Sequence, residues 1–306
     1  MREDIWNELL GGVPDTYLAV DCEFLPGTED SLVLLEVGHA MVSQGKVIDR
    51  LSVVLNCFAE NNGKSSEFSY RLSKLSSHMG PGWRLTAPYI QREGKDPRKV
   101  LPKYFDVLNQ WADSGHLFIA HNGIAADERS LRAAFRQYDI ADDFRFPGRQ
   151  YLDTGAVFLA HRLLGLDRPE YRSYRKEAQV KPNETSGEYS RRLLGLRIPG
   201  LKWSVSEAVS VLGVDMSDVP GDAHAADYDS VCIHRVLQKI IEETKGSSEF
   251  SIATGADLQK IADVMVPETA EERKLRDSRY NPGDQVKSQK GTSNWKKKRR
   301  RRQRNI

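Results

Sequence analysis

Cysteine and long hydrophobic runs are both scarce in this sequence. The cysteines among its 306 residues are Cys22, Cys57 and Cys232, and their wide spacing argues against the disulfide framework of a small secreted protein. No stretch approaches the roughly 20 apolar residues of a membrane-spanning helix, and the first residues include acids where a secretory signal would be apolar. With a mean hydropathy of −0.55, these absences predict an intracellular protein, cytoplasmic or nuclear, that does not enter membranes.

Acidic residues are missing from the end of the chain, so the two parts of the sequence differ in charge: the body is acidic and the end is basic. The segment from Lys287 to Ile306 has ten lysines and arginines and no acid, so residues 1–286 carry 35 basic and 43 acidic side chains. Such a basic block repels itself and is predicted to stay largely disordered until it meets a polyanion. We therefore predict a globular domain over residues 1–245 and a low-complexity basic tail over 246–306. The composition of the tail is compatible with contact to nucleic acid, with a nuclear-import signal, or with both.

The hydrophobic pattern predicts an α/β domain. Three β-rich segments, Thr16–Phe24, Ser31–Val42 and Val47–Asn56, come first, with the turn pair Gln44-Gly45 between the last two. This opening is expected to be an antiparallel meander, and a short apolar strand, Leu117–Ala120, follows it. Helical spacing recurs in residues 100–111, 127–138, 154–164, 204–212 and 225–243. Strands first and interleaved helices afterwards indicate a mixed sheet with flanking helices.

Two polar stretches interrupt this plan and are interpreted as insertions in the domain. Residues 59–94 are predicted to be irregular. Residues 167–202 carry nine lysines and arginines, five acids and three tyrosines.

Asp21 and Glu23 are the first candidate functional residues. They stand two residues apart at the end of an apolar strand, so both carboxylates are expected to project from one face while Cys22 turns to the other. An acidic pair at a strand end is common by chance, and this motif alone leaves its function open.

Asp127 is the second candidate. It begins a helical pattern whose apolar face includes Leu131, Ala134 and Phe135, so its carboxylate is expected to point toward the sheet. A helix-capping aspartate is the alternative. Capping does not require orientation toward the core, and the apolar face therefore favours the functional interpretation.

His224 and Asp229 form the third candidate segment. Steps of three and four residues from Asp229 reach apolar residues such as Ile233, whereas the same steps from Asp227 reach mostly polar ones. Asp229 is therefore predicted to face the core and Asp227 the solvent. His224 is expected in the loop that enters this helix, above Asp229.

Four carboxylates directed at one place would repel one another, and burying them unpaired is unfavourable. Divalent cations resolve this conflict, and a set of oxygen ligands favours Mg²⁺ or Mn²⁺. Two such ions about 3.5–4 Å apart can activate a water molecule and stabilise the leaving oxygen of a phosphodiester. A neutral histidine within reach of that water can act as the general base. The predicted cofactor is therefore a pair of Mg²⁺ or Mn²⁺ ions.

Three motifs, in this order, resemble those of the DEDDh exonucleases, a DnaQ-like family of 3′–5′ exonucleases. AVDCEF contains Asp21 and Glu23, AHNGIAAD contains Asp127, and HAADYD contains His224 and Asp229. The segment LLEVGHAMV also resembles the family's second strand, and the similarity covers about residues 16–243. The resemblance implies a ribonuclease H-like fold, with a mixed five-stranded sheet and flanking helices.

The resemblance also implies an activity and a role for each motif. The protein would release nucleoside 5′-monophosphates from the 3′ end of single-stranded DNA or RNA. Asp21, Glu23 and Asp229 would hold the ion that activates water. Asp21 would bridge to a second ion held by Asp127, and His224 would take the proton. The implied substrate contacts are Phe24, Leu25, His121 and Asn122. A polymerase or another replication or repair protein is an expected partner.

Two departures from the family pattern limit these implications. Six residues separate His121 from Asp127, where most members have five, and this spacing is similar to that of the three-prime repair exonucleases. Phe24 stands where the family often has threonine near the terminal 3′-hydroxyl, so discrimination between sugars is not implied.

Two alternative functions remain open at this point. The first is a catalytically idle DnaQ-like module that binds nucleic acid or a polymerase, although the presence of all five signature residues argues against it. The second is a two-metal endonuclease of the ribonuclease H kind. His224, five residues before Asp229, favours the exonuclease.

Overall fold

The computed structural model describes residues 16–28, 31–58, 65–79, 82–166, 168–221 and 224–245. The chain divides into two compact units, Met1–Ile261 and Ala262–Ile306, and every described residue lies in the first. The basic tail predicted over 246–306 lies outside the described residues and stays a prediction. Within the described ranges, no helix combines the length and the hydrophobicity needed to cross a membrane.

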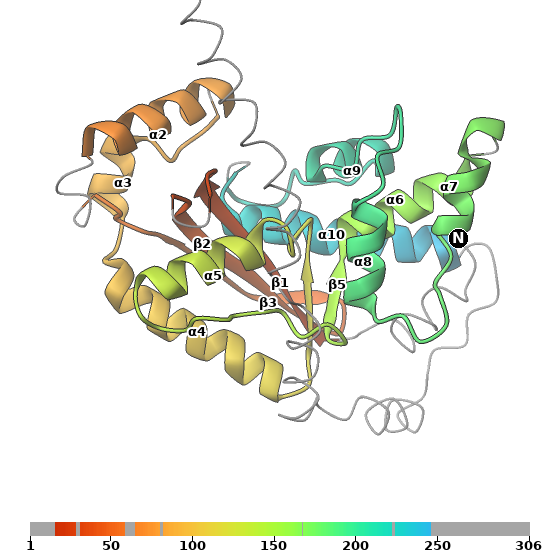
Figure 1. Cartoon of the computed structure of the whole chain (residues 1–306), viewed down its shortest axis with the longest axis horizontal. Helices are drawn as coiled ribbons and strands as arrows, with labels where there is room; N and C mark the ends of the chain where they lie inside the picture. The colour runs from red at the N-terminus through yellow and green to blue at the C-terminus, as the bar shows by residue number, and fades with distance from the viewer. Residues whose placement is uncertain are drawn as a thin grey trace, which may run out of the picture. The chain divides into compact units, whose positions relative to one another are not determined.

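Five strands form one mixed sheet in the order β3-β2-β1-β4-β5 (Figure 1). They are β1 (Thr16–Leu25), β2 (Val33–Ser43), β3 (Lys46–Val54), β4 (Leu117–Ala120) and β5 (Tyr151–Asp153). The first three pair antiparallel, and β4 and β5 continue the sheet in parallel. Gln44 and Gly45 turn β2 into β3 with φ values of 51° and 70°, as a tight two-residue hairpin requires. The predicted meander and the mixed five-stranded sheet are confirmed.

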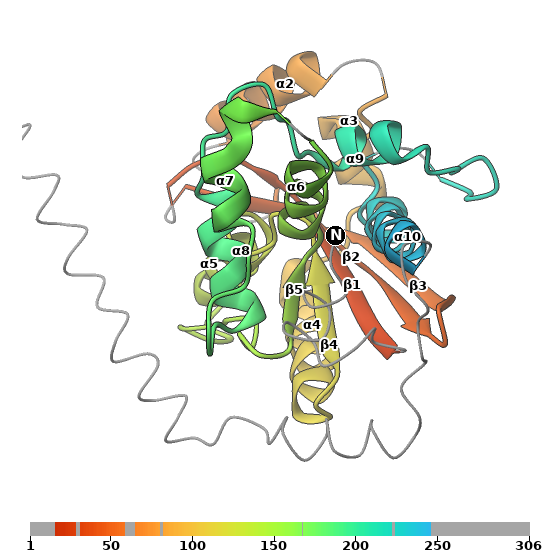
Figure 2. The same cartoon turned by 90° about the vertical axis from the view of Figure 1, so that its right-hand side faces the viewer.

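Helices cover both faces of the sheet. Side chains alternate along β1, so that Leu18 and Val20 face one hydrophobic core while Tyr17 and Ala19 face another. The first core is closed by α4 (Pro97–Asp113) and α5 (Asp127–Gln137). The second is closed by α10 (Ala226–Lys245), α9 (Val205–Leu212) and one side of α6 (Thr154–Gly165). Figures 1 and 2 show α4 and α5 on the side of the sheet opposite α10.

The segment 59–94 is not irregular as predicted, and this interpretation is wrong for most of its length. It contains α2 (Ser65–Met79) and α3 (Ala87–Glu93). The apolar residues of α2 stand at helical spacing but are interspersed with serines, and these conceal the pattern in the sequence. The segment contributes five buried side chains to the first core: Phe68, Leu72, Trp83, Leu85 and Ile90.

The segment 167–202 forms a small helical layer of its own. It contains a 3₁₀ turn (Pro169–Tyr171), α7 (Arg172–Glu177) and α8 (Ser186–Leu194). Tyr189 is fully buried and packs in a third core against the second side of α6. The tyrosines of this insertion therefore attach it to the domain, while its charged residues remain near the surface.

Gly38 fixes the distance between β2 and α10. A Cβ atom at this position would lie 2.6 Å from the Cβ of Ala226, well inside van der Waals contact. Gly38 is also the register partner of Asp21 on β1. The close approach therefore brings the first turn of α10, which carries Asp229, over the end of β1.

Candidate active site

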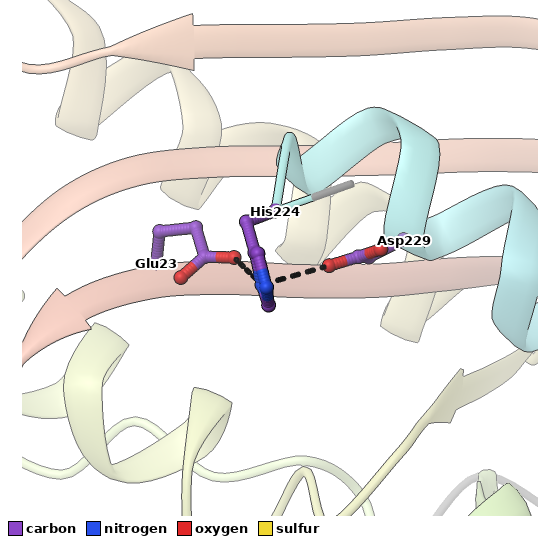
Figure 3. A group of neighbouring side chains, drawn as sticks. All are labelled: Glu23, His224 and Asp229. Atoms are coloured by element: carbon purple, nitrogen blue, oxygen red, sulfur yellow. Dashed lines mark ion pairs between the residues drawn. The ribbon is translucent and has the colours of Figure 1, made fainter. Parts of the chain in front are cut away.

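The five residues selected from the sequence motifs come from three separate elements. Asp21 and Glu23 lie on β1, Asp127 begins α5, and Asp229 lies in the first turn of α10 with His224 just before it. Figure 3 shows the His224 ring between the carboxylates of Glu23 and Asp229. Its Nδ1 atom lies 3.8 Å from a Glu23 oxygen and 3.9 Å from an Asp229 oxygen. These three residues offer ligand atoms that all lie within 4.8 Å of one another.

Asp127 approaches the same place from the other side of β1. Its side chain is 2% exposed, and its Oδ1 atom accepts a hydrogen bond of 2.8 Å from the backbone N–H of Cys22. This bond joins the start of α5 to the strand between Asp21 and Glu23. Asp127 therefore points inward, as the apolar face of its helix predicts, and is not merely a cap at an exposed helix end.

The four carboxylates strongly perturb one another. Burial raises the pKa of Asp21, and the charges of Asp127, Asp229 and Glu23 raise it further. Burial, followed by the charge of Asp229, raises the pKa of Glu23 to about 9. The pKa of Asp229 is raised to about 7, chiefly by burial. Carboxylates in this state lack a sufficient positive charge nearby, and pKa shifts of this kind mark candidate functional sites.

His224 has the properties of a neutral base. Partial burial lowers the pKa of its imidazole, so the ring stays neutral over a wider pH range. Its backbone has a φ of 66°, in the left-handed region that non-glycine residues seldom occupy. This conformation belongs to the turn into α10 and sets the ring above the carboxylates.

Asp227 lies apart from the cluster although it is only two residues from Asp229. It forms an ion pair of 2.7 Å with Arg50 of β3, and both side chains are 23% exposed. Asp227 is thus partly buried in this pair instead of facing solvent freely. The opposite orientations of Asp227 and Asp229 follow from the helical geometry of α10.

Asp153 is a structural residue of the site that the motif argument did not select. It is fully buried at the end of β5 and accepts hydrogen bonds from four donors: the backbone N–H groups of Asn122, Gly123 and Gly155, and the hydroxyl of Tyr151. Its carboxylate therefore fixes the turn that leads into α5 and, with it, the position of Asp127. An acid inside the apolar stretch YLDTGAVF was the signal in the sequence.

Glu36 of β2 is a fifth carboxylate beside the cluster, and it was also not selected. It is the register partner of Glu23 and is fully buried. Its Oε1 atom accepts hydrogen bonds from Arg84 and Ser52, and more weakly from the backbone N–H of Ala226 at 3.4 Å. Glu36 thereby links the segment after α2 to the start of α10. An acid in the middle of the apolar segment LLEVGHAMV could have pointed to it.

The residues proposed to contact substrate occupy unlike environments. Phe24 and Asn122 are partly exposed. Leu25 is 1% exposed and packs in the first core, so this arrangement leaves it no surface for a base. The register of β1 shifts between Glu23 and Phe24, and this irregularity turns Leu25 inward.

His121 is likewise committed to the protein interior. Its side chain is buried, Nδ1 lies 3.0 Å from the Thr154 hydroxyl, and Nε2 contacts the carbonyl oxygen of Trp203. Both ring nitrogens are therefore occupied, and the described contacts give His121 a role in joining β4 to α6.

The donor set fits hard divalent cations. Asp21, Glu23, Asp127 and Asp229 supply only oxygen atoms, the ligands preferred by Mg²⁺ and Mn²⁺. The raised pKa values of these acids reflect charge repulsion and burial that a cation would relieve. The nearby Arg84 forms its ion pair with Glu36. Among the described residues, the four acids of the cluster have no direct ion pair to lysine or arginine.

Comparison with solved structures finds exonucleases at low sequence identity. No protein-family model matches the chain, and no curated protein sequence matches it. E. coli exonuclease I in complex with single-stranded DNA aligns at 10% identity and a TM-score of 0.44 over 76% of this chain. The chain spans 42% of the length of that enzyme.

Two further structures align over a larger share of their own length. Exonuclease X in complex with 5′-overhanging duplex DNA aligns at 15% identity and a TM-score of 0.35, covering 81% of this chain and 99% of that one. A 3′-exonuclease that recognises the histone mRNA stem-loop aligns at 12% identity and a TM-score of 0.43, covering 76% and 65%.

Proposed function

We propose that this protein is a metal-dependent 3′–5′ exonuclease of the DEDDh type, which removes nucleoside 5′-monophosphates from single-stranded DNA or RNA. The observation that carries the proposal is the convergence of Glu23, His224 and Asp229, whose ligand atoms lie within 4.8 Å of one another. Asp21 and Asp127 interact electrostatically with the same cluster. A polarity of 3′ to 5′ is the expectation carried by the three ordered motifs.

Each residue has a defined task in the proposed reaction. Asp21, Glu23 and Asp229 would hold one Mg²⁺ or Mn²⁺ ion, and Asp127 would hold a second one together with Asp21. These ions would supply an activated water molecule and neutralise the charge that develops on the phosphate. His224, whose Nδ1 atom lies 3.8 and 3.9 Å from the Glu23 and Asp229 carboxylates, would take the proton of the attacking water.

The surroundings of the cluster support this division of tasks. The burial that lowers the pKa of His224 keeps its ring able to accept a proton at neutral pH. Hydrogen bonds from Cys22 to Asp127 and from the 122–123 turn to Asp153 hold α5 against the sheet. Asp127 is therefore held in place before substrate arrives, which lowers the cost of ordering the site.

The nuclease experiment uses the full chain and 5′-labelled oligonucleotides of matched DNA and RNA sequence, with Mg²⁺ or Mn²⁺. An exonuclease of this polarity produces a ladder that shortens one nucleotide at a time, and it stalls when the 3′ end is blocked. Internal cuts in the blocked strand would indicate an endonuclease instead. Binding without cleavage of any strand would indicate a non-catalytic nucleic-acid module.

A further inference from the structure

We propose that Trp83 is a positioning residue for His224, and that Arg84 anchors it in place. This inference rests on the proposed function, because it assigns a role in holding the general base of that reaction. It concerns a segment between β3 and α4 to which no motif of the sequence points.

The contact between Trp83 and His224 is direct. Their ring centroids lie 5.7 Å apart with an angle of 59° between the ring planes, within the range of a favourable aromatic pair. Trp83 is 4% exposed and belongs to the first core, whereas the side chain of His224 is 40% exposed. The buried Trp83 ring therefore packs against one side of the His224 ring, which is otherwise accessible to solvent.

Few other contacts restrain the imidazole. Within the described part of the chain, the ring faces Glu23 and Asp229 at 3.8 and 3.9 Å, distances too long for direct hydrogen bonds. Both carboxylates are also proposed metal ligands and would be directed at cations in the working enzyme. The remaining contact, with Trp83, is the one that persists without competing with metal.

Arg84 fixes the position of the Trp83 ring. Its guanidinium contacts the buried carboxylate of Glu36 and donates a hydrogen bond of 2.8 Å to the hydroxyl of Tyr89. Since Glu36 lies on β2 opposite Glu23, the backbone at residues 83 and 84 is held to the strand next to the catalytic one. Trp83 is thus positioned relative to the carboxylate cluster and not only by its own chain segment.

The indole N–H of Trp83 provides a way to test the mode of action. This Nε1 atom is buried and has no hydrogen-bond partner among the residues that the structure describes, so the inferred role is assigned to the ring and not to the N–H group. Phenylalanine at position 83 keeps an aromatic ring beside His224 without that donor, and alanine removes the ring. The comparison of these two replacements therefore separates packing against His224 from a polar contact with substrate.

The experiment compares Trp83→Ala and Trp83→Phe with wild type in steady-state cleavage, with Mn²⁺ binding followed by electron paramagnetic resonance. Trp83→Ala should lower kcat by roughly 10- to 100-fold through misplacement of the base, with KM and Mn²⁺ affinity near the wild-type values. Trp83→Phe should recover most of the lost kcat. Trp111→Ala is the matched control, because this tryptophan packs on the same core but hydrogen-bonds to Leu117; its kcat should stay near wild type.

A second readout does not depend on turnover. The ring-proton resonances of His224, assigned by their loss in His224→Gln, should shift in Trp83→Ala because the ring current of the indole is removed. Wild-type kcat in Trp83→Ala, or an unshifted resonance, would overturn the inference. Equal losses in Trp83→Ala and Trp83→Phe confined to KM would also overturn it, in favour of a substrate contact. A wild-type protein inactive on every nucleic acid would instead refute the proposed function, while the resonance shift would still report on the contact.

Discussion

Two groups of carboxylates in this protein have opposite surroundings. Asp153 is fully buried and accepts four hydrogen bonds, and Glu36 is bound by Arg84. At the end of β1, in contrast, Asp21 and Glu23 meet mainly other acids, and their pKa values are raised. Asp153 and Glu36 are fully buried and supplied with donors or positive charge, whereas Asp21 and Glu23 are partly buried and lack such partners among the described residues. The difference separates acids that hold the fold from acids that we propose bind a cation.

Substitutions in the carboxylate cluster should have their largest effect on turnover. Asp21→Asn, Glu23→Gln, Asp127→Asn, Asp229→Asn and His224→Ala should each lower kcat by about 100-fold or more, because each removes a proposed metal ligand or the proposed base. Asp227→Asn should have a mild effect, since Asp227 is paired with Arg50 outside the cluster. The cleavage rate of each variant is measured in single-turnover experiments, and circular dichroism checks that the variant is folded. Loss of activity in Asp227→Asn with retention in Asp229→Asn would reverse our assignment of the helix face.

The second effect is on stability. Neutralising an acid should destabilise the fold at Asp153 and stabilise it at Asp21. Asp153→Asn should lower the free energy of unfolding by about 2 kcal/mol or more, because it leaves buried backbone donors with poorer acceptors. Asp21→Asn should raise the melting temperature of the metal-free protein, because it removes an ionisable acid whose charged form is disfavoured by burial and by the neighbouring acids. Thermal unfolding in the presence of a chelator compares the two variants. Destabilisation by both would show that Asp21, like Asp153, is satisfied by donors in the fold.

The third effect is the pH dependence of the metal-free protein. Folding raises the pKa of Glu23 from 4.5 to about 9 and that of Asp229 from 3.8 to about 7, so the folded state binds these protons more tightly than the unfolded state. Stability should therefore be greatest below about pH 4 as far as these groups contribute, and decrease as the pH rises toward 9. Each retained proton contributes a slope of at most about 1.4 kcal/mol per pH unit. Thermal unfolding across a pH series with a chelator present measures this trend.

Divalent cations should reverse this trend. Mg²⁺ or Mn²⁺ competes with protons for the same oxygens, so the melting temperature near pH 8 should rise with metal concentration by mass action. Asp229→Asn should reduce both the pH slope and the response to metal. A wild-type melting temperature that is independent of both ions would remove the cluster from consideration as a metal site.

The smallest expected effect concerns the basic tail. Removal of residues 287–306 deletes ten positive charges and should weaken binding to long strands and flatten its salt dependence, because fewer counterions are released. Turnover of a short oligonucleotide at low salt should change little, since the proposed chemistry lies in residues 16–243. Binding to a long single strand is measured across a salt series for both forms. Equal affinities and slopes would favour a nuclear-import signal or a protein partner as the role of the tail.

Four of the five strands and the main helices were predictable from local pattern, whereas the three-residue β5 was too short to give one. β4 begins at Leu117 and ends at Ala120 as expected, and α5 begins at Asp127, because alternation and helical spacing are strong where one face is fully buried. The segment containing α2 was missed because serines separate its apolar residues. Its packing depends on contacts with β1 and β2, which are distant in the sequence.

The site was predictable as a set of acids but not as a working arrangement. Helix-face arguments indicated that Asp127 and Asp229 point inward, since each is followed by an apolar stripe. They did not reveal Trp83 or Asp153, whose importance lies in contacts with residues 30 or more positions away. Hydrogen-bond networks and aromatic contacts between distant segments leave no periodic signal, and for this reason the supporting residues emerged only from the structure.

The absence of a side chain at Gly38 has a mechanical consequence. Because β2 and α10 touch there through backbone atoms, a single methyl group would act as a wedge under the first turn of the helix. The wedge would lift Asp229 and His224 away from Asp21 and Glu23 without altering any of these four side chains. One carbon atom, placed outside the proposed reacting centre, would thus separate Asp229 and the proposed base from the carboxylates of β1.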